Sequence, residues 1–228
     1  MLSLILGDHP QSYVQKHLLL PSPSPCSSSP STNQFILNHR KRIPTPHLRK
    51  TIGVVSPELF DAFPRRHPGM TVRQAIETGF EGVFVPLPGD SNSTLGEEEE
   101  EQWRKARVQE MLENLGPPAW TSPKNGPHHQ TIQEFASKRF TDLSTGEQRI
   151  VLLMRALVGQ PPVVLLDEVW SSMTGDMVRA ARRYLRGGGL DCEQAVVVIT
   201  HWEDEVPWSV VEGLKRFRLQ DGKGQVVV

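Results

Sequence analysis

The sequence has few of the features that mark secreted, metal-clustered or membrane-spanning proteins. Its two cysteines, Cys26 and Cys192, are too few for a disulfide framework or a four-ligand zinc site. It has no run of about 18 apolar residues, so no segment is predicted to cross a bilayer. We therefore expect two unpaired thiols in a reducing compartment inside the cell, with the cytosol as the first expectation.

The chain also lacks an excess of either charge. It has 25 Lys and Arg against 26 Asp and Glu, for a formal net charge of −1. This balance gives no reason to expect nucleic acid or a membrane surface as a partner. The length of 228 residues, 37% of them hydrophobic, fits one or two globular domains with some disordered portion.

Acidic residues are almost absent from residues 1–50, where only Asp8 occurs. Residues 21–33, PSPSPCSSSPSTN, are of low complexity. Together with the basic stretch that follows to residue 50, they are predicted to be a disordered N-terminal segment. This composition also suits a mitochondrial transit peptide, so a mitochondrial location stays open.

Ordered signals begin at Thr51, and the chain from there to residue 228 is predicted to be an α/β core. Residues 51–55 form a short β-type run, and residues 56–69 are predicted to be a loop. Helices are predicted at 72–80 (capped by Thr71), 97–116, 131–140, 147–159 and about 175–186. A hairpin is predicted at 217–228, with its turn at Asp221-Gly222-Lys223-Gly224.

Two apolar runs without alternation, VVLL at 163–166 and AVVVIT at 195–200, flank the last of these helices. Such runs are typical of parallel strands covered on both faces. A strand, a helix and a strand predict a parallel α/β sheet with a right-handed crossover.

Polar residues end both strands, Asp167 and Glu168 the first and Thr200 and His201 the second. Ligands gather beyond the carboxyl ends of parallel strands, so both sets are predicted to face one edge. Asp167 suits a Mg²⁺ site, Glu168 could orient or deprotonate a water, and His201 could donate to a phosphate oxygen. Alone, an acidic pair is often just a loop start, and a lone histidine is more often structural.

The sequence LSTGEQ places Ser144 and Gly146 at a helix N-terminus, where free N–H groups and the dipole favour anions. The alternative is an ordinary Ser N-cap with Glu147 at the N3 position, which together form a capping box.

Three stretches in this order resemble the signature motif, the Walker B strand and the switch histidine of ABC-type ATPases. They are LSTGEQR at 143–149, VVLLDE at 163–168 and ITHWEDEVP at 199–207, with 23 positions from Ser144 to Asp167. The resemblance covers about residues 51–228 and is greatest to cassettes of the molybdate-transport ATP-binding and photorepair-protein type.

The resemblance implies a P-loop NTPase-like parallel sheet with a small helical subdomain at about 71–158. It implies ATP and Mg²⁺ as cofactors, and a second ABC cassette as the partner that shares the ATP. Asp167 would hold the metal, and Glu168 and His201 would be catalytic. The nucleotide contacts of the signature turn would be Ser144, Thr145, Gly146, Glu147 and Gln148.

The sequence departs from this family pattern in four places. No G-x-x-x-x-G-K-[S/T] P-loop occurs in the 228 residues, yet residues 2–10, LSLILGDHP, resemble the helix that follows it. We therefore expect an N-terminally truncated cassette. Pro57 or Glu58 occupies the Q-loop position, and residues 169–177, VWSSMTGDM, lack the usual Leu-Asp of the D-loop. The aromatic residue that stacks on adenine is absent as well.

Two functions stay open, with a weaker third. The first is an ATP-hydrolysing cassette whose coupled task is not determined. The second is a non-hydrolysing module that offers its signature turn to the ATP site of an intact cassette. The third is an interaction protein that uses the basic residues 39–50. A membrane partner is left open by all three.

Overall fold

The computed structural model describes residues 19–21, 37–39, 49–65, 69–85, 95–121, 131–209, 214–220 and 223–227. In this part of the chain, the central feature is a parallel sheet of three strands in the order β3–β4–β5. The strands are β3 (Ile52–Val55), β4 (Val163–Asp167) and β5 (Ala195–Ile199). The α/β fold with a parallel sheet, predicted from the two unbroken apolar runs, is confirmed.

The central strand β4 is buried on both of its faces. Val164 and Leu166 belong to the main core with the helices, whereas Val163 and Leu165 pack with Ile52 on the opposite face. Successive side chains of a strand point to opposite faces, so a strand covered on both sides must be apolar at every position. This requirement explains why the sequence of β4 does not alternate.

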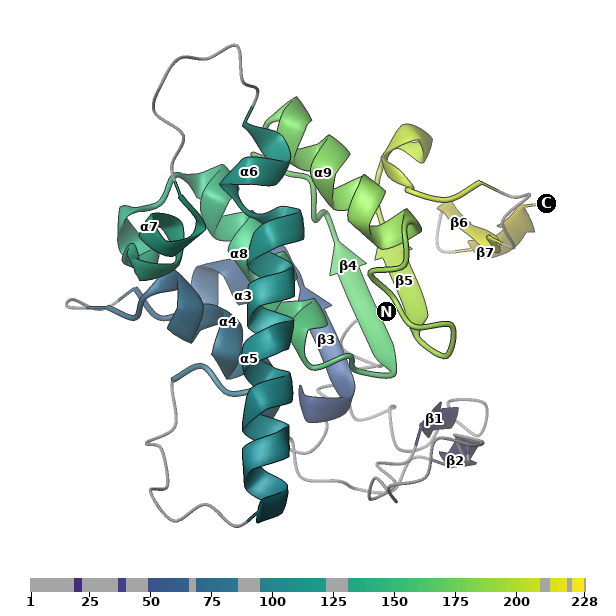
Figure 1. The fold of residues 1–228 in the computed structure, drawn as a ribbon. Helices are drawn as coiled ribbons and strands as arrows, with labels where there is room; N and C mark the ends of the chain where they lie inside the picture. The colour runs from purple at the N-terminus through teal and green to yellow at the C-terminus, as the bar shows by residue number, and fades with distance from the viewer. Residues whose placement is uncertain are drawn as a thin grey trace.

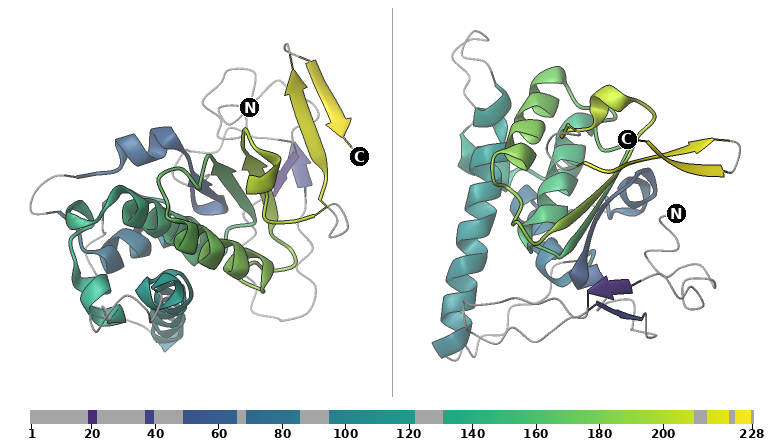
Figure 2. Two further views of the ribbon diagram at one scale, coloured as in Figure 1. Left: turned by 90° about the horizontal axis from the view of Figure 1, so that it is seen from above. Right: turned by 90° about the vertical axis from the view of Figure 1, so that its right-hand side faces the viewer.

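Seven α-helices lie within the described residues. They are α3 (Pro57–Ala62), α4 (Val72–Glu81), α5 (Leu95–Leu115), α6 (Pro117–Trp120), α7 (Ile132–Ser137), α8 (Thr145–Val158) and α9 (Gly175–Arg186), with short 3₁₀ turns η3 (Phe140–Asp142) and η4 (Glu203–Glu205). Helices α8 and α9 cover one face of the sheet, and the long helix α5 packs across them (Figures 1 and 2). None of the helices in these ranges is long and apolar enough to cross a membrane.

The prediction of a loop over residues 56–69 is wrong for its first half, because α3 begins directly after β3. Ser56 is the N-cap, its hydroxyl accepts the N–H of Leu59 at 3.1 Å, and Pro57 occupies the first turn. Proline is tolerated there because the N–H that it lacks has no partner inside the helix. The helix places Glu58 near the carboxyl edge of the sheet.

Both ends of the chain contribute small antiparallel pairs. Strand β1 (Leu19–Pro21), at the start of the segment predicted to be disordered, pairs with β2 (Leu37–His39) inside that segment. Residues 2–10, which resemble the helix after a P-loop, and residues 22–33 lie outside the described residues. Strand β6 (Arg216–Gln220) pairs with β7 (Lys223–Val227), which confirms the hairpin. Of its predicted turn, Asp221 and Gly222 are not among the described residues. The domain boundary after residue 50 and the helical subdomain stay predictions.

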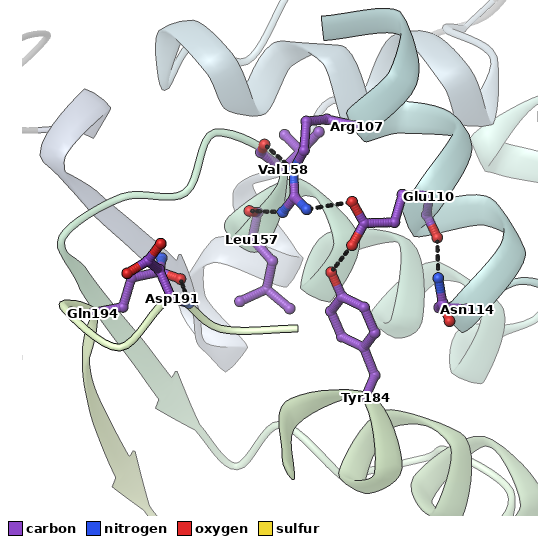
Figure 3. Close-up of polar contacts among 8 residues, drawn as sticks. All are labelled: Arg107, Glu110, Asn114, Leu157, Val158, Tyr184, Asp191 and Gln194. Carbon is purple, nitrogen blue, oxygen red and sulfur yellow. Dashed lines mark hydrogen bonds and ion pairs between the residues drawn. The ribbon is translucent and has the colours of Figure 1, made fainter. Parts of the chain in front are cut away.

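A buried polar network joins α5, α8 and α9 (Figure 3). Arg107 of α5 donates to the carbonyl oxygens of Leu157 and Val158, both at 3.4 Å, at the C-terminus of α8. Its guanidinium also pairs with Glu110, whose other carboxylate oxygen accepts the hydroxyl of Tyr184 on α9 at 3.0 Å. The last carbonyls of a helix have no partner within the helix, so Arg107 caps α8 as it fixes α5 in place.

Candidate active site

The ends of β4 and β5 bring the predicted catalytic residues together. Asp167 lies opposite Ile199 in the ladder, and the N–H of Glu168 donates to the carbonyl of Ile199 at 3.1 Å. Two residues later, Nε2 of His201 lies 3.0 Å from Oε1 of Glu168. The carboxylate can only accept, so the imidazole N–H donates in this contact. The predicted meeting of Asp167, Glu168 and His201 at one edge is confirmed, while their roles stay predictions.

Glu168 leaves the strand through a left-handed backbone conformation. Its φ is 47°, a region that costs a residue with a Cβ on the order of 1–2 kcal/mol. Ser172, four residues on, also has a positive φ of 63°. The turn is closed by the N–H of Ser171, which donates to the carbonyl of Glu168, and by the N–H of Met173, which donates to that of Trp170. The turn therefore aims the Glu168 carboxylate at His201.

Asp167 lies in an environment that disfavours its negative charge. Burial raises the pKa of Asp167, the charges of Glu58 and Glu168 raise it further, and His201 opposes them. A bound cation would stabilise the charged form of such a carboxylate. No group of three or more His, Cys, Asp or Glu side chains gathers for a metal within the described ranges. This donor set fits Mg²⁺, which takes one or two carboxylates and fills its other positions with water and substrate phosphate.

Glu58 also belongs to this acidic edge. The sequence left open whether Pro57 or Glu58 occupies the Q-loop position. The carboxyl end of β3 lies beside that of β4, since Val55 pairs with Leu166. Helix α3 then begins at once, so its second residue stays close enough to raise the pKa of Asp167. The signal available in the sequence was Ser56-Pro57, an N-cap followed by a first-turn proline.

The signature turn adopts the capping box that the sequence left as an alternative. Ser144 donates its hydroxyl to Oε2 of Glu147 at 2.7 Å and its backbone N–H to the same oxygen at 2.8 Å. The N–H of Glu147 in turn donates to the Ser144 hydroxyl at 3.4 Å. Ser144 and Thr145 are exposed at this helix start, so a partner can reach them. The capping box does not remove the anion-binding character of the helix N-terminus.

Gly146 and Gln148 are buried and support the structure of the signature turn. A Cβ on Gly146 would lie 2.6 Å from the carbonyl oxygen of Ser172, so only glycine allows the turn after Glu168 to approach α8. Gln148 is 8% exposed, and its amide donates to the carbonyls of Phe140 and Leu143 at 3.1 and 3.2 Å. Because these backbone acceptors engage its amide, we leave Gln148 out of the nucleotide contacts proposed below.

A cleft of about 290 Å³ runs beside β3 and reaches Ser56 and Glu58 at one end. Arg155 of α8 borders it as a buried charge, and burial together with Arg49 lowers the pKa of Arg155 to about 10. The guanidinium donates to Oγ1 of Thr78 at 2.9 Å and to the carbonyl of Val83 at 2.7 Å. These bonds tie α8 to α4, which gives Arg155 a structural role.

Comparison with known families adds an independent observation. The family model described as ABC transporter matches residues 28–171. An uncharacterized ABC transporter ATP-binding protein of Schizosaccharomyces pombe is 26% identical over 223 residues, which is 98% of this chain and 36% of the relative. The ABC transporter ATP-binding protein ModF of Escherichia coli is 25% identical over 221 residues, 94% of this chain and 35% of its own length. The chain thus spans about a third of these curated relatives.

A solved structure agrees on the fold. An ABC transporter in an inward-facing conformation superposes with a TM-score of 0.51 at 16% identity, over 78% of this chain and 58% of the other.

Proposed function

This chain belongs to the ABC transporter family, and we propose that it is an ATP-binding cassette whose Asp167, Glu168 and His201 act on the terminal phosphate of ATP. The 3.0 Å contact between His201 and Glu168 at the carboxyl edge of the sheet is the observation that carries the proposal. The relatives are about three times as long as this chain. That the chain shares the activity of an entire ATP-binding protein is therefore proposed.

The proposed reaction is phosphoryl transfer to water. Glu168 orients a water and accepts its proton as the water oxygen bonds to the γ-phosphorus, and the bond from that phosphorus to the β–γ bridging oxygen breaks. The electron pair stays on the leaving ADP. His201, whose side chain is 81% exposed, turns from Glu168 and donates its N–H to a γ-phosphate oxygen. Asp167 would hold Mg²⁺, which neutralises phosphate charge when bound.

A second cassette is the proposed partner. The two would pair head to tail, so that exposed Ser144 and Thr145, at the N-terminus of α8, meet the γ-phosphate of the ATP held by the partner. Gly146 allows the close approach of Ser172 to this turn, and Glu147 holds Ser144 in the capping box. The place of the chain inside the cell stays a prediction.

The 228 residues contain no P-loop, and this favours a second candidate function. In it, the chain hydrolyses nothing and completes the ATP site of an intact cassette with its signature turn. Mixing the chain with such a cassette tests it, with Ser144→Ala as the variant. The alternative expects the mixture to hydrolyse ATP faster than the cassette alone and the variant to lose that gain. Equal rates for the chain and the variant would end it.

The main proposal is tested by joining the chain to a P-loop-bearing segment of a family cassette, here termed the complemented chain. Glu168→Gln is expected to lower its phosphate release by about 100-fold or more and to leave ATP binding intact. Glu193→Gln is the matched control, because Glu193 is an exposed carboxylate before the opposite end of β5. Equal turnover in the Glu168 and Glu193 variants would remove Glu168 from catalysis.

A further inference from the structure

The turn after Glu168 contains a tryptophan that reaches across to the loop carrying His201. Trp170 is 6% exposed, and its indole N–H donates to the backbone carbonyl of Glu205 at 2.7 Å, across 35 positions of the chain. A bond of this length between a buried donor and a carbonyl contributes to the geometry of both segments.

A second bond holds the same loop from α9. Arg182 donates to the carbonyl of Asp204, and its guanidinium lies over the Trp170 ring, 5.6 Å from the centroid. Turn η4 (Glu203–Glu205) is therefore held by one hydrogen bond from Trp170, in the turn after Glu168, and by another from Arg182 of α9. Stacking of the guanidinium on the ring limits the orientations of the indole.

From η4, two further bonds lead back to the residues that flank His201. The hydroxyl of Thr200 donates to the carboxylate of Glu205, and the N–H of Trp202 donates to that hydroxyl at 3.2 Å. Trp170, two residues after Glu168, is thus bonded to Glu205, and Glu205 is bonded to Thr200, the neighbour of His201. The contact of His201 with Glu168 at 3.0 Å closes this ring of contacts. In such a ring, each bond limits the freedom of the others.

Core packing is the plain alternative for Trp170, which does belong to the main hydrophobic core. Packing explains the burial of the indole ring, but it does not explain why the single indole N–H donates to the loop that carries His201. We propose that Trp170 is a positioning residue for the proposed ATP hydrolysis. Through the carbonyl of Glu205 it fixes the loop of His201, and so His201 itself, relative to Glu168. This inference rests on the proposed function of that pair.

The first test uses the full chain without nucleotide. Trp170→Phe keeps an aromatic ring and removes the N–H. The NMR signals of the His201 ring are measured in this variant. Glu168→Ala gives the reference signals of a histidine without its carboxylate partner. Trp170→Phe should move the His201 signals toward that reference. The control is Trp120→Phe, since the indole of Trp120 also donates to a carbonyl, that of Leu115 at 2.8 Å on a neighbouring helix. It should leave His201 unchanged.

Should Trp170→Phe fail to fold, benzothienylalanine at position 170 keeps the shape of the indole and lacks the N–H. His201 signals that stay at their wild-type positions in the variant that folds would overturn the inference.

The second test measures kinetics in the complemented chain. Loss of the Trp170 N–H should lower kcat about tenfold, with the KM for ATP unchanged, because the bond positions a group that acts in the transition state. An unchanged kcat, in a chain where Glu168→Gln abolishes turnover, would overturn the positioning role and leave the proposed function standing. Full turnover in Glu168→Gln would instead refute the proposed function, and this inference with it.

Discussion

Nε2 of His201 lies 3.0 Å from Oε1 of Glu168, although 33 positions separate the two residues. The contact follows from the register of two parallel strands, in which Asp167 lies opposite Ile199. Because each strand ends at this point, each chain segment turns out of the sheet into the same space. An acid and an imidazole placed in this way can act together on one substrate group.

Replacement of Gly146 by alanine is expected to destabilise the chain by about 1–3 kcal/mol, as overpacking does in a rigid site. The added Cβ would lie 2.6 Å from the carbonyl oxygen of Ser172, which the turn after Glu168 holds in place. Urea unfolding measures the change. Gly175→Ala is the control, since its Cβ would meet only Arg179 at 3.7 Å at the start of α9. An equal stability for both variants would show that the turn yields easily.

Tyr184 is expected to make the stability of the chain depend on alkaline pH. Burial raises the pKa of Tyr184 to about 12, above its ordinary value of 10. A folded pKa above the unfolded one gives stability that is present below pH 10 and is lost as the pH rises toward 12. Urea unfolding at pH 9 and at pH 11 should therefore show a smaller loss for Tyr184→Phe than for the wild type. Equal losses would contradict burial of this hydroxyl.

Removal of an acceptor from Arg155 is expected to cost about 1–3 kcal/mol, the penalty for an unsatisfied buried polar group. Thr78→Val keeps the shape of the side chain and removes the oxygen that accepts Nε of Arg155 at 2.9 Å. The free energy of unfolding reports the loss. Thr141→Val is the control, because its hydroxyl donates to the exposed Asp142. A change below about 0.5 kcal/mol in Thr78→Val, the range of ordinary surface substitutions, would argue that another acceptor replaces the hydroxyl.

The sequence predicted those features that local pattern controls. The unbroken apolar runs of β4 and β5 identified two parallel strands, and the residues that follow them identified the acidic edge and its histidine. Thr71 marked the start of α4 in the same way, and it is the N-cap of that helix in the structure. Each of these signals lies within a few residues of the feature that it predicts.

Features that depend on distant contacts were missed. One local feature was missed as well, because Ser56-Pro57 predicts a loop by its proline, whereas the N-cap bond of Ser56 makes it the start of α3. The left-handed conformation of Glu168 is held by its hydrogen bond to Ile199 of β5 and by the packing of Trp170. No glycine or asparagine at this position predicts such a conformation. The hydrogen bond from the amide of Gln148 to the carbonyl of Phe140 was not predicted, and the assignment of Gln148 to the nucleotide contacts stays a prediction.

A double-mutant cycle on phosphate release tests the central claim most directly. In the complemented chain, Glu168→Gln and His201→Ala are each expected to lower the turnover by about 100-fold. Because the two side chains would act as one unit, the double variant should lose no more than about tenfold beyond either single variant. Independent losses that multiply to about 10⁴-fold, or full turnover in either single variant, would contradict a joint site of Glu168 and His201.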